Sequence, residues 1–354
     1  MLIRAKQIGS FLAATLLLTG MTAYAKGAQP SHHTIPSPMP DASASTPGST
    51  VPTGAQMVDA LHTAFGDHHV RAVHAKGIFA TGVFEPSPQA ASLSKALVFH
   101  SHNIPVLLRF SDFTGIPDIP DNVGDSNPRG LALKFTLSDG STTDVINHSF
   151  NGFPTSDSAQ FRELLLAIGA SGPGATKPTA IDRFLDSHPV AKTFLTTQKP
   201  PSESYTTLSY FGVNAFRFTD SKGKAVNVRY RFVPTSGEKF LSADQMKSVG
   251  PNYLAQELPA RLAKGPVTYK WFAQVADESD ALDDPSVAWP ESRRLVELGT
   301  IRITGMALND QAQDRTTFFR PLNVPDGISA MDPMLTIRQE AYPISFKNRQ
   351  LPAN

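Results

Sequence analysis

Apolar and polar residues alternate along much of the chain beyond residue 70. In residues 131–137 and 226–232, every second side chain is a large apolar one, and this period of two predicts half-buried strands. The Asp139-Gly140 pair followed by the return segment 144–147 is typical of a hairpin. Further strands are predicted at residues 70–84, 104–111, 216–218, 267–273 and 295–303. These make about eight strands, spaced as an antiparallel meander or a closed barrel requires.

A second pattern, with apolar residues about four positions apart, marks helices around these strands. Residues 57–65 carry it, and Gly66 is a natural end for that helix. Residues 161–168 predict another helix, with Gly169 as its stop. Residues 242–245, Ser-Ala-Asp-Gln, form a capping box that opens a third. Strands and helices together predict an α+β fold.

The first 54 residues have a different composition. Residues 1–25 combine a basic start, a short apolar run and the small-x-small sequence Ala23-Tyr24-Ala25. This pattern predicts a secretory signal peptide cleaved after Ala25, and hence a periplasmic protein. An uncleaved membrane anchor is the alternative. Residues 26–54 are rich in Pro and Ser and predict a flexible tether, in which His32-His33 could bind a metal or do nothing. Residues 55–354 are the predicted folded domain.

Charge and cysteine content exclude several functions. The 354-residue chain carries a formal net charge of +1, with 18% charged residues. It therefore offers no electrostatic basis for binding nucleic acid or acidic membranes. The chain contains no cysteine, which excludes disulfides, iron–sulfur clusters and thiolate-ligated haem.

Two stretches carry candidate chemistry. In the first, His74 precedes an apolar run bounded by Gly77 and Gly82, where the backbone can approach something closely. On a strand there, His74 could face a buried flat ligand, or it could be an ordinary histidine with hydrogen-bond partners.

The second stretch lies near the C-terminus, where Arg338, Tyr342 and Arg349 fall on one stripe of a predicted helix. Pro343 should kink or disturb this helix next to Tyr342. An arginine one turn from a tyrosine oxygen suits an anionic oxygen ligand for ferric iron. An exposed Arg–Tyr contact is the alternative interpretation.

Four blocks of sequence, in this order, carry a resemblance to a known family. They are Arg71-x-x-His74-Ala-Lys-Gly77, Pro105-Val-Leu-Leu-Arg109-Phe-Ser111, Asn127-Pro-Arg-Gly-Leu-Ala-Leu-Lys-Phe135, and Arg338-x-x-x-Tyr342 with Arg349. Together they resemble the catalase superfamily, and more closely its short branch, the catalase-related peroxidases. The resemblance extends from about residue 57 to residue 349.

This resemblance implies an eight-stranded antiparallel β-barrel with surrounding helices and a haem b pocket beside the barrel. Tyr342 would be the proximal iron ligand and Arg338 its charge partner. His74 would be the distal acid–base, with Ser111 fixing its tautomer.

The resemblance also assigns residues around the edge of the haem. Arg71, Arg109 and Arg349 would pair with the haem propionates, although Arg71 or Arg109 could instead form surface ion pairs. Phe161 would pack on the macrocycle or be ordinary core.

The sequence departs from large catalases in three ways. The expected distal asparagine aligns with His148, with Asn147 and Asn151 nearby, and the sequence leaves open which of the three enters the pocket. The chain stops soon after the proximal helix, so no NADPH site is expected. A monomer or a small homo-oligomer is expected, because the arm that interlocks tetramers is replaced.

The resemblance implies a haem peroxidase that reduces hydrogen peroxide or an organic hydroperoxide with a small organic electron donor, with weak catalase activity. Alternatives are a small H₂O₂-dismutating catalase, an exported haem carrier or sensor, and an enzyme that rearranges lipid hydroperoxides. A zinc or copper protein that uses His68-His69 and His100-x-His102 is a further alternative.

Overall fold

The computed structural model describes residues 50–307 and 310–351. The chain divides into a unit of residues 1–49 and a unit of residues 50–354, and the second unit carries the fold. The predicted signal peptide, nearly all of the tether and His32-His33 lie outside the described residues. Within the described part, no helix is long and apolar enough to cross a membrane.

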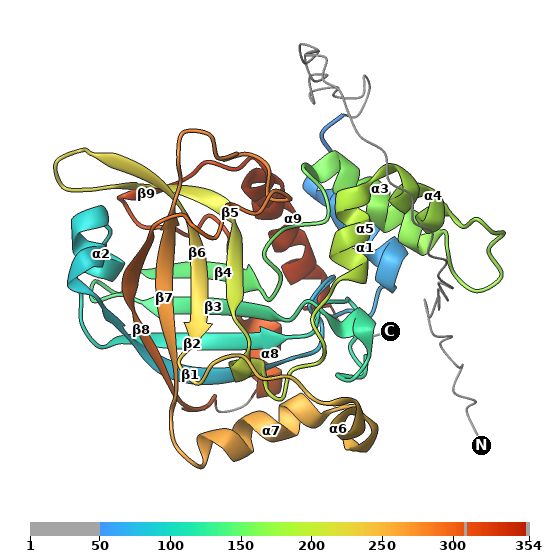
Figure 1. Cartoon of the computed structure of the whole chain (residues 1–354), viewed down its shortest axis with the longest axis horizontal. Helices are drawn as coiled ribbons and strands as arrows, with labels where there is room; N and C mark the ends of the chain where they lie inside the picture. The colour runs from blue at the N-terminus through green and yellow to red at the C-terminus, as the bar shows by residue number, and fades with distance from the viewer. Residues whose placement is uncertain (1–49, 308–309, 352–354) are drawn as a thin grey trace, which may run out of the picture. The chain divides into compact units, whose positions relative to one another are not determined.

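Eight antiparallel strands form a closed barrel, as predicted (Figure 1). Each strand pairs with the next, β1 also pairs with β8, and the pairing of His148 with Phe211 joins β4 to β5. A short strand, β9 (Ile328–Ala330), extends β5. The barrel strands are β1 (Gly77–Pro86), β2 (Ile104–Ser111), β3 (Gly130–Thr136), β4 (Thr142–His148), β5 (Tyr210–Thr219), β6 (Ala225–Pro234), β7 (Val267–Val275) and β8 (Leu295–Met306).

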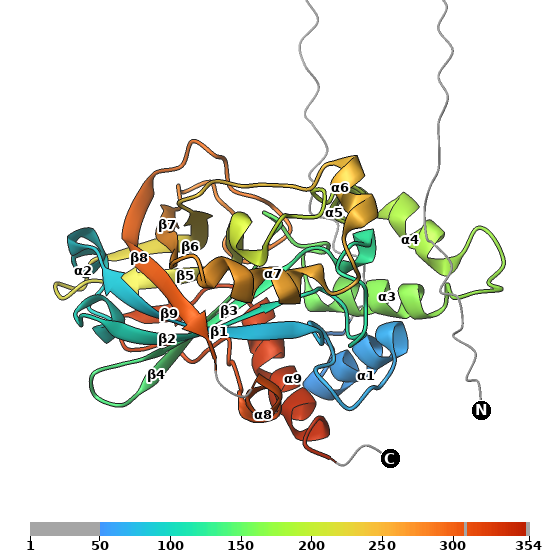
Figure 2. The same cartoon turned by 90° about the horizontal axis from the view of Figure 1, so that it is seen from below.

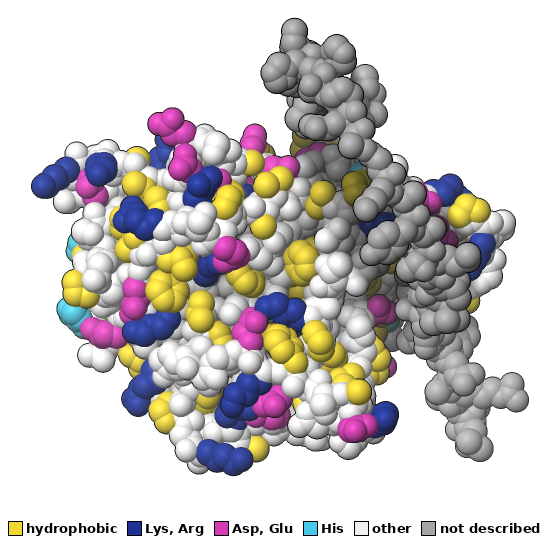
Figure 3. All heavy atoms as spheres, viewed as in Figure 1, with side chains coloured by type: hydrophobic (Ala, Val, Ile, Leu, Met, Phe, Trp, Pro, Cys, Tyr) yellow, Lys and Arg dark blue, Asp and Glu magenta, His cyan; other side chains and the backbone are white. Residues whose placement is uncertain are grey.

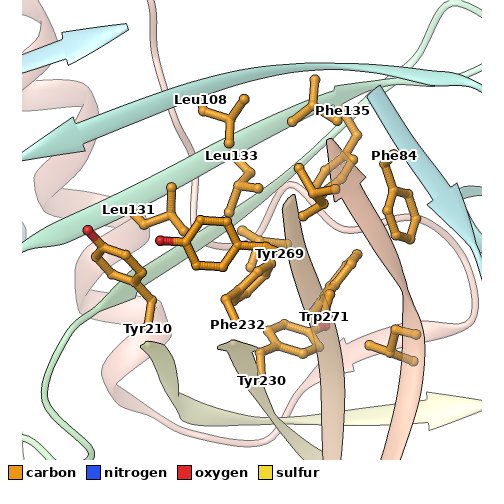
Figure 4. Packing of buried hydrophobic residues seen from close by; sticks show 14 of the residues in the cluster. Phe84, Leu108, Leu131, Leu133, Phe135, Tyr210, Tyr230, Phe232, Tyr269 and Trp271 are labelled. Carbon is orange, nitrogen blue, oxygen red and sulfur yellow. The ribbon is translucent and has the colours of Figure 1, made fainter. Parts of the chain in front are cut away.

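The interior of the barrel is filled with large side chains rather than with a ligand-sized space (Figure 4). Trp271 stacks against Phe135 and Phe232, with ring centroids 5.4 and 5.3 Å apart. Each fully buried side chain of this size stabilises the fold by about 1.5–3 kcal/mol. A ligand of any size must therefore bind outside the barrel.

Helices cover the outside of the barrel. α1 packs on both α9 and α3, and the three helices lie together on one side of the barrel (Figures 1 and 2). Short 3-10 turns lie at residues 97–99, 124–126 and 205–207. The helices are α1 (Gly54–Phe65), α2 (Pro88–Leu93), α3 (Ser158–Gly169), α4 (Ala180–Ser187), α5 (Pro189–Thr196), α6 (Ala243–Ser248), α7 (Tyr253–Leu262), α8 (Asp310–Thr316) and α9 (Met334–Asn348).

Three local expectations differ from the structure. The strand predicted at residues 70–84 begins only at Gly77, because the N–H groups of His74 and Ala75 bond to the loop after β2 and not to a strand. Gly169 ends α3, but the cap that follows it is not left-handed. A Cβ at Gly169 would lie 2.6 Å from the Thr63 carbonyl oxygen, so close packing on α1 is what requires glycine here. α9 continues through Pro343 without interruption.

The surface agrees with the near-zero net charge. On the face seen in Figure 3, Lys and Arg side chains are interspersed with Asp and Glu. That face shows no broad basic patch of the kind that binds nucleic acid.

Candidate active site

A cavity of about 1460 Å³, its open mouth included, lies between the outer wall of the barrel and α1, α3, α5 and α9. All nine predicted site residues line it, although they come from four different helices and strands, from the loop before β1 and from the residue after α9. These residues are Arg71, His74, Arg109, Ser111, His148, Phe161, Arg338, Tyr342 and Arg349.

A row of residues across one rim of the barrel forms the floor of this cavity. Strand register pairs Gly77 with Ser111, Ser111 with Gly130, Gly130 with His148, and His148 with Phe211. Directly paired residues share one face of a sheet. The hydroxyl and the imidazole therefore point outward together, away from the packed barrel interior.

Gly130 in this row is a functional position that the sequence did not single out. A Cβ at this position would lie 2.4 Å from Ser111 Oγ and 2.8 Å from His74 Nδ1. No side chain can occupy that space, so the glycine is what allows the histidine to rest on the barrel wall.

The His74 imidazole is held through one ring nitrogen. Its Nδ1 lies 2.9 Å from the carbonyl oxygen of Asp112 and 3.1 Å from Ser111 Oγ. A carbonyl can only accept, so Nδ1 carries the proton and Nε2 is left as an acceptor. Burial, followed by the positive charge of Arg109, lowers the pKa of His74 to about 3. The ring is therefore neutral and able to accept a proton.

The loop that carries His74 has a strained backbone and is held in place by hydrogen bonds from Arg109. His74 has a φ of 57°, in the left-handed region, which costs a non-glycine residue free energy that the surroundings must offset. Arg109 offsets it by donating to the carbonyl oxygens of His74 and Ala75 at 2.8 and 2.9 Å.

A buried ionic cluster lies behind the Asp112 carbonyl, and the sequence did not predict it. The Asp112 carboxylate pairs with Arg129 and accepts from the Tyr205 hydroxyl at 2.9 Å. Asp121 pairs with Lys76 next to it. Burial and the charge of Asp121 raise the pKa of Asp112 to about 6, against the opposing effect of Arg129. The cluster fixes the residue whose backbone orients His74.

The structure also shows which residue at the end of β4 reaches the cavity. Both Asn147 and His148 line the cavity. Asn151 does not line it, and its side chain instead donates to the Glu291 side chain at 3.2 Å. His148 Nε2 is buried and has no protein partner. Burial, and then the charge of the nearby His74, lowers the pKa of His148 to about 3. Two neutral imidazoles thus face the same space.

Tyr342 enters the cavity from α9, on the side formed by that helix. Its oxygen accepts from Arg338 Nε at 3.2 Å and from Nη2 at 2.8 Å. Asn214 Oδ1 accepts from Arg338 Nη1 at 2.6 Å, and Asn214 in turn donates to Asp332 at 2.7 Å. Asn214 and Asp332 are positioning residues that the sequence did not predict, because they lie more than a hundred residues apart.

Three arginines gather at another part of the cavity wall. Arg71 and Arg109 share the Oδ1 oxygen of Asp314, with their Nε atoms at 3.2 and 2.8 Å. Arg349 donates to the Thr317 carbonyl, while its buried Nε has no partner. Burial, with the positive charge of Arg109 added to it, lowers the pKa of Arg349 to about 10, against the opposing effect of Asp314.

Phenylalanines form much of the remaining wall. Phe161 packs on Phe153 with ring centroids 4.8 Å apart, and Phe113 meets the His74 ring edge-on at 5.6 Å. Phe194 of α5 lies 6.2 Å from the His148 ring. Such a wall excludes water and suits a flat apolar ligand.

The histidines of the alternative metal site do not converge. His68 bonds to the Phe65 carbonyl, His100 to the Ser94 carbonyl, and His102 to Glu85. Among the residues that the structure describes, no group of three His, Asp or Glu side chains could hold a metal ion.

Comparison with known proteins identifies the family of the chain. The family model described as catalase matches residues 33–354. The chain belongs to the catalase family. Two relatives named catalase-related peroxidase place it in the short branch. The one from Mycolicibacterium paratuberculosis is 38% identical and aligns with 83% of this chain and 94% of that protein. The one from Synechococcus elongatus is 32% identical and aligns with 83% and 88%.

Solved structures agree on the fold of this catalase-family chain. A fungal catalase has a TM-score of 0.71 at 22% identity, over 79% of this chain and 59% of the fungal one. In the sequence comparison, pig catalase is 27% identical, and the match spans 80% of this chain and 58% of the pig protein. The family match and the two short relatives make the protein a catalase-family oxidoreductase that acts on peroxide. Its chain spans little more than half the length of a large catalase.

Proteins of this family generally bind haem, and the cavity fits that group. Its arginine cluster holds three cations against the single carboxylate of Asp314, so it would accept a ligand with two carboxylates. The orphaned Nε of Arg349 is a donor for such a ligand. The aromatic walls, the arginine-bonded Tyr342 oxygen and the open Nε2 side of His74 complete the set of groups that a haem requires.

Proposed function

We propose that this protein is a haem b peroxidase that reduces hydrogen peroxide or an organic hydroperoxide with a small organic electron donor. The observation that carries the proposal is that one cavity contains both an arginine-bonded tyrosine oxygen and a neutral histidine with a fixed tautomer. Bound haem would supply an iron centre able to take two oxidising equivalents from the peroxide, and the donor would supply the two electrons that restore the resting state.

Each residue has a role in the proposal. Tyr342 would hold the iron, and Arg338 would limit the electron donation of Tyr342 by binding its oxygen. His74 Nε2 would accept the proton of the hydroperoxide and return it to the departing oxygen. General acid–base help of this kind contributes roughly 10²–10⁴-fold. Arg71 and Arg349 would bind the haem carboxylates.

His148 supports peroxidase over catalase chemistry. Its imidazole stands where the sequence comparison led us to expect an asparagine, and Phe153 and Phe194 pack around it. A ring is bulkier than an amide, so it leaves less room for a second hydrogen peroxide to be oxidised to O₂. An organic donor, which can be oxidised at the edge of the cavity, is affected less.

The test combines spectroscopy with two assays. The full chain, loaded with haemin, should show a tyrosinate-type visible spectrum that Tyr342→Phe loses. With peroxide it should oxidise a phenolic donor much faster than it releases O₂, and His148→Asn should shift that ratio toward O₂. His74→Ala should keep the spectrum and lose most of the peroxide reactivity. A carrier or sensor would be indifferent to that substitution, and catalase-like O₂ release by the wild type would favour dismutation.

The location of the protein is part of the same proposal. The composition of residues 1–25 supports export to the periplasm. Mass spectrometry of the exported protein should find an N-terminus after Ala25. An intact N-terminus in a membrane fraction would favour the anchor.

A further inference from the structure

α8 places one carboxylate among the three arginines of the cavity. Asp314 Oδ1 lies 3.2 Å from Arg71 Nε and 2.8 Å from Arg109 Nε. Among the side chains that the structure describes, no other carboxylate forms an ion pair with Arg71, Arg109 or Arg349. Asp314 is thus the internal counter-ion of the arginine cluster, and neither the fold nor the proposed reaction explains why it is there.

The charges of the cluster do not balance without a ligand. Three guanidinium groups and one carboxylate leave two positive charges. Arg109 and Arg349 are each only 4% exposed, so water screens these charges poorly. The two carboxylates of a haem would bring the total to zero while Asp314 stays in place.

The hydrogen bonds assign different tasks to the arginines. All three nitrogens of Arg109 donate to protein: Nε to Asp314, and the other two to the carbonyls of His74 and Ala75. Arg349 keeps an unpartnered Nε. Asp314 and Arg109 therefore hold the His74 loop in place, whereas the free donors for a ligand come from Arg349 and Arg71.

We infer that Asp314 is a stand-in anion that keeps the arginine cluster folded before the cofactor binds, and that it thereby weakens the cofactor's carboxylate contacts. The inference rests on the proposed haem site. Asp314 stabilises the ligand-free chain more than the loaded one, because a loaded cluster has two further anions. Removing its charge should therefore destabilise the empty protein and tighten the binding of a dianionic porphyrin.

The experiment measures both effects on the full chain with Asp314→Asn. Asp326→Asn is the matched control, since Asp326 forms an exposed ion pair with Lys95 at 2.8 Å. Probes are protoporphyrin IX, which carries two carboxylates, and its uncharged dimethyl ester. The D314N apoprotein should melt at a lower temperature than wild type. It should bind protoporphyrin roughly tenfold more tightly, which is the effect of about one charge-assisted hydrogen bond. The ester should show no such gain, and Asp314→Glu should restore wild-type melting.

The outcomes separate the two levels of inference. If wild type binds neither haemin nor protoporphyrin, the haem site itself is wrong. If wild type binds both but D314N melts and binds as D326N does, or binds protoporphyrin more weakly, only the role of Asp314 is overturned. If D314N folds only when loaded, the inference is supported. If it folds in neither state, Asp314 is a general structural residue and the inference fails.

Discussion

The two histidines that line the cavity should make the ligand-free protein sensitive to acid. Burial lowers the pKa values of His74 and His148 to about 3, whereas a histidine in the unfolded chain titrates near about 6.5. As the pH falls below about 6.5, these two histidines become protonated in the unfolded chain but stay neutral in the folded chain. This contribution to stability is complete above pH 6.5 and is lost progressively as the pH falls toward 3.

The size of the effect follows from the width of this window. One excess proton costs about 1.36 kcal/mol per pH unit. Between pH 7.5 and pH 4.5, each histidine should therefore lower the free energy of unfolding by about 2.7 kcal/mol. The loss depends only on the unfolded pKa, near about 6.5, and on the lower assay pH of 4.5. It therefore stays the same for any folded pKa below roughly 4.

Urea unfolding of the apoprotein at both pH values tests the reasoning. His148→Gln should reduce the pH-dependent loss by about 2.7 kcal/mol relative to wild type, whatever it does to stability at pH 7.5. His68→Gln is the control, since His68 is exposed. If H148Q and wild type lose equal stability on acidification, His148 is charged in the folded protein and the neutral pair at the rim is wrong.

Three other substitutions or conditions test separate parts of the site. Gly130→Ala should displace His74 or Ser111 and cut peroxide reactivity in stopped-flow assays while haem stays bound, whereas Gly124→Ala, with open space around it, should be silent. Asn214→Leu should lower the free energy of unfolding in urea by about 1–3 kcal/mol, because Arg338 and Asp332 each lose a hydrogen bond to Asn214. An unchanged urea midpoint would show that neither hydrogen bond stabilises the fold. The rate of reaction with peroxide should be flat between pH 5 and 8, because the pKa of His74 lies near 3; an inflection near neutral pH would exclude His74 as the proton acceptor.

The barrel was predictable because its strands carry local signals. β2 has the predicted bounds, and the 131–147 and 216–232 hairpins formed as the period of two indicates. The strand predicted at residues 70–84 failed before Gly77, where the backbone N–H groups of His74 and Ala75 bond to the Phe113 and Thr114 carbonyls across the barrel end. Hydrophobic periodicity contains no information about such long-range bonds.

The ambiguity at the end of β4 has a related cause. Strand geometry puts Asn147 and His148 on opposite faces, yet both line the cavity because it extends over the rim where β4 meets β5. Asp314 was missed for another reason. α8 has no apolar period, so nothing in its sequence marks it as a helix beside the site.

The positive charge that suits the cavity for a dicarboxylate also acts on its histidine. Burial is the largest cause of the lowered pKa of His74, and the charges of Arg109, Arg338 and Arg71 add to it. A bound dianion would weaken the effect of the arginine charges on the pKa of His74. It would leave the His74 side chain as buried as before, or bury it further. Because burial is the largest cause, the pKa of His74 should stay well below neutral on loading. The same imidazole is thus a neutral proton acceptor in both states, and the charge balance of the cluster sets cofactor affinity without governing the acid–base step.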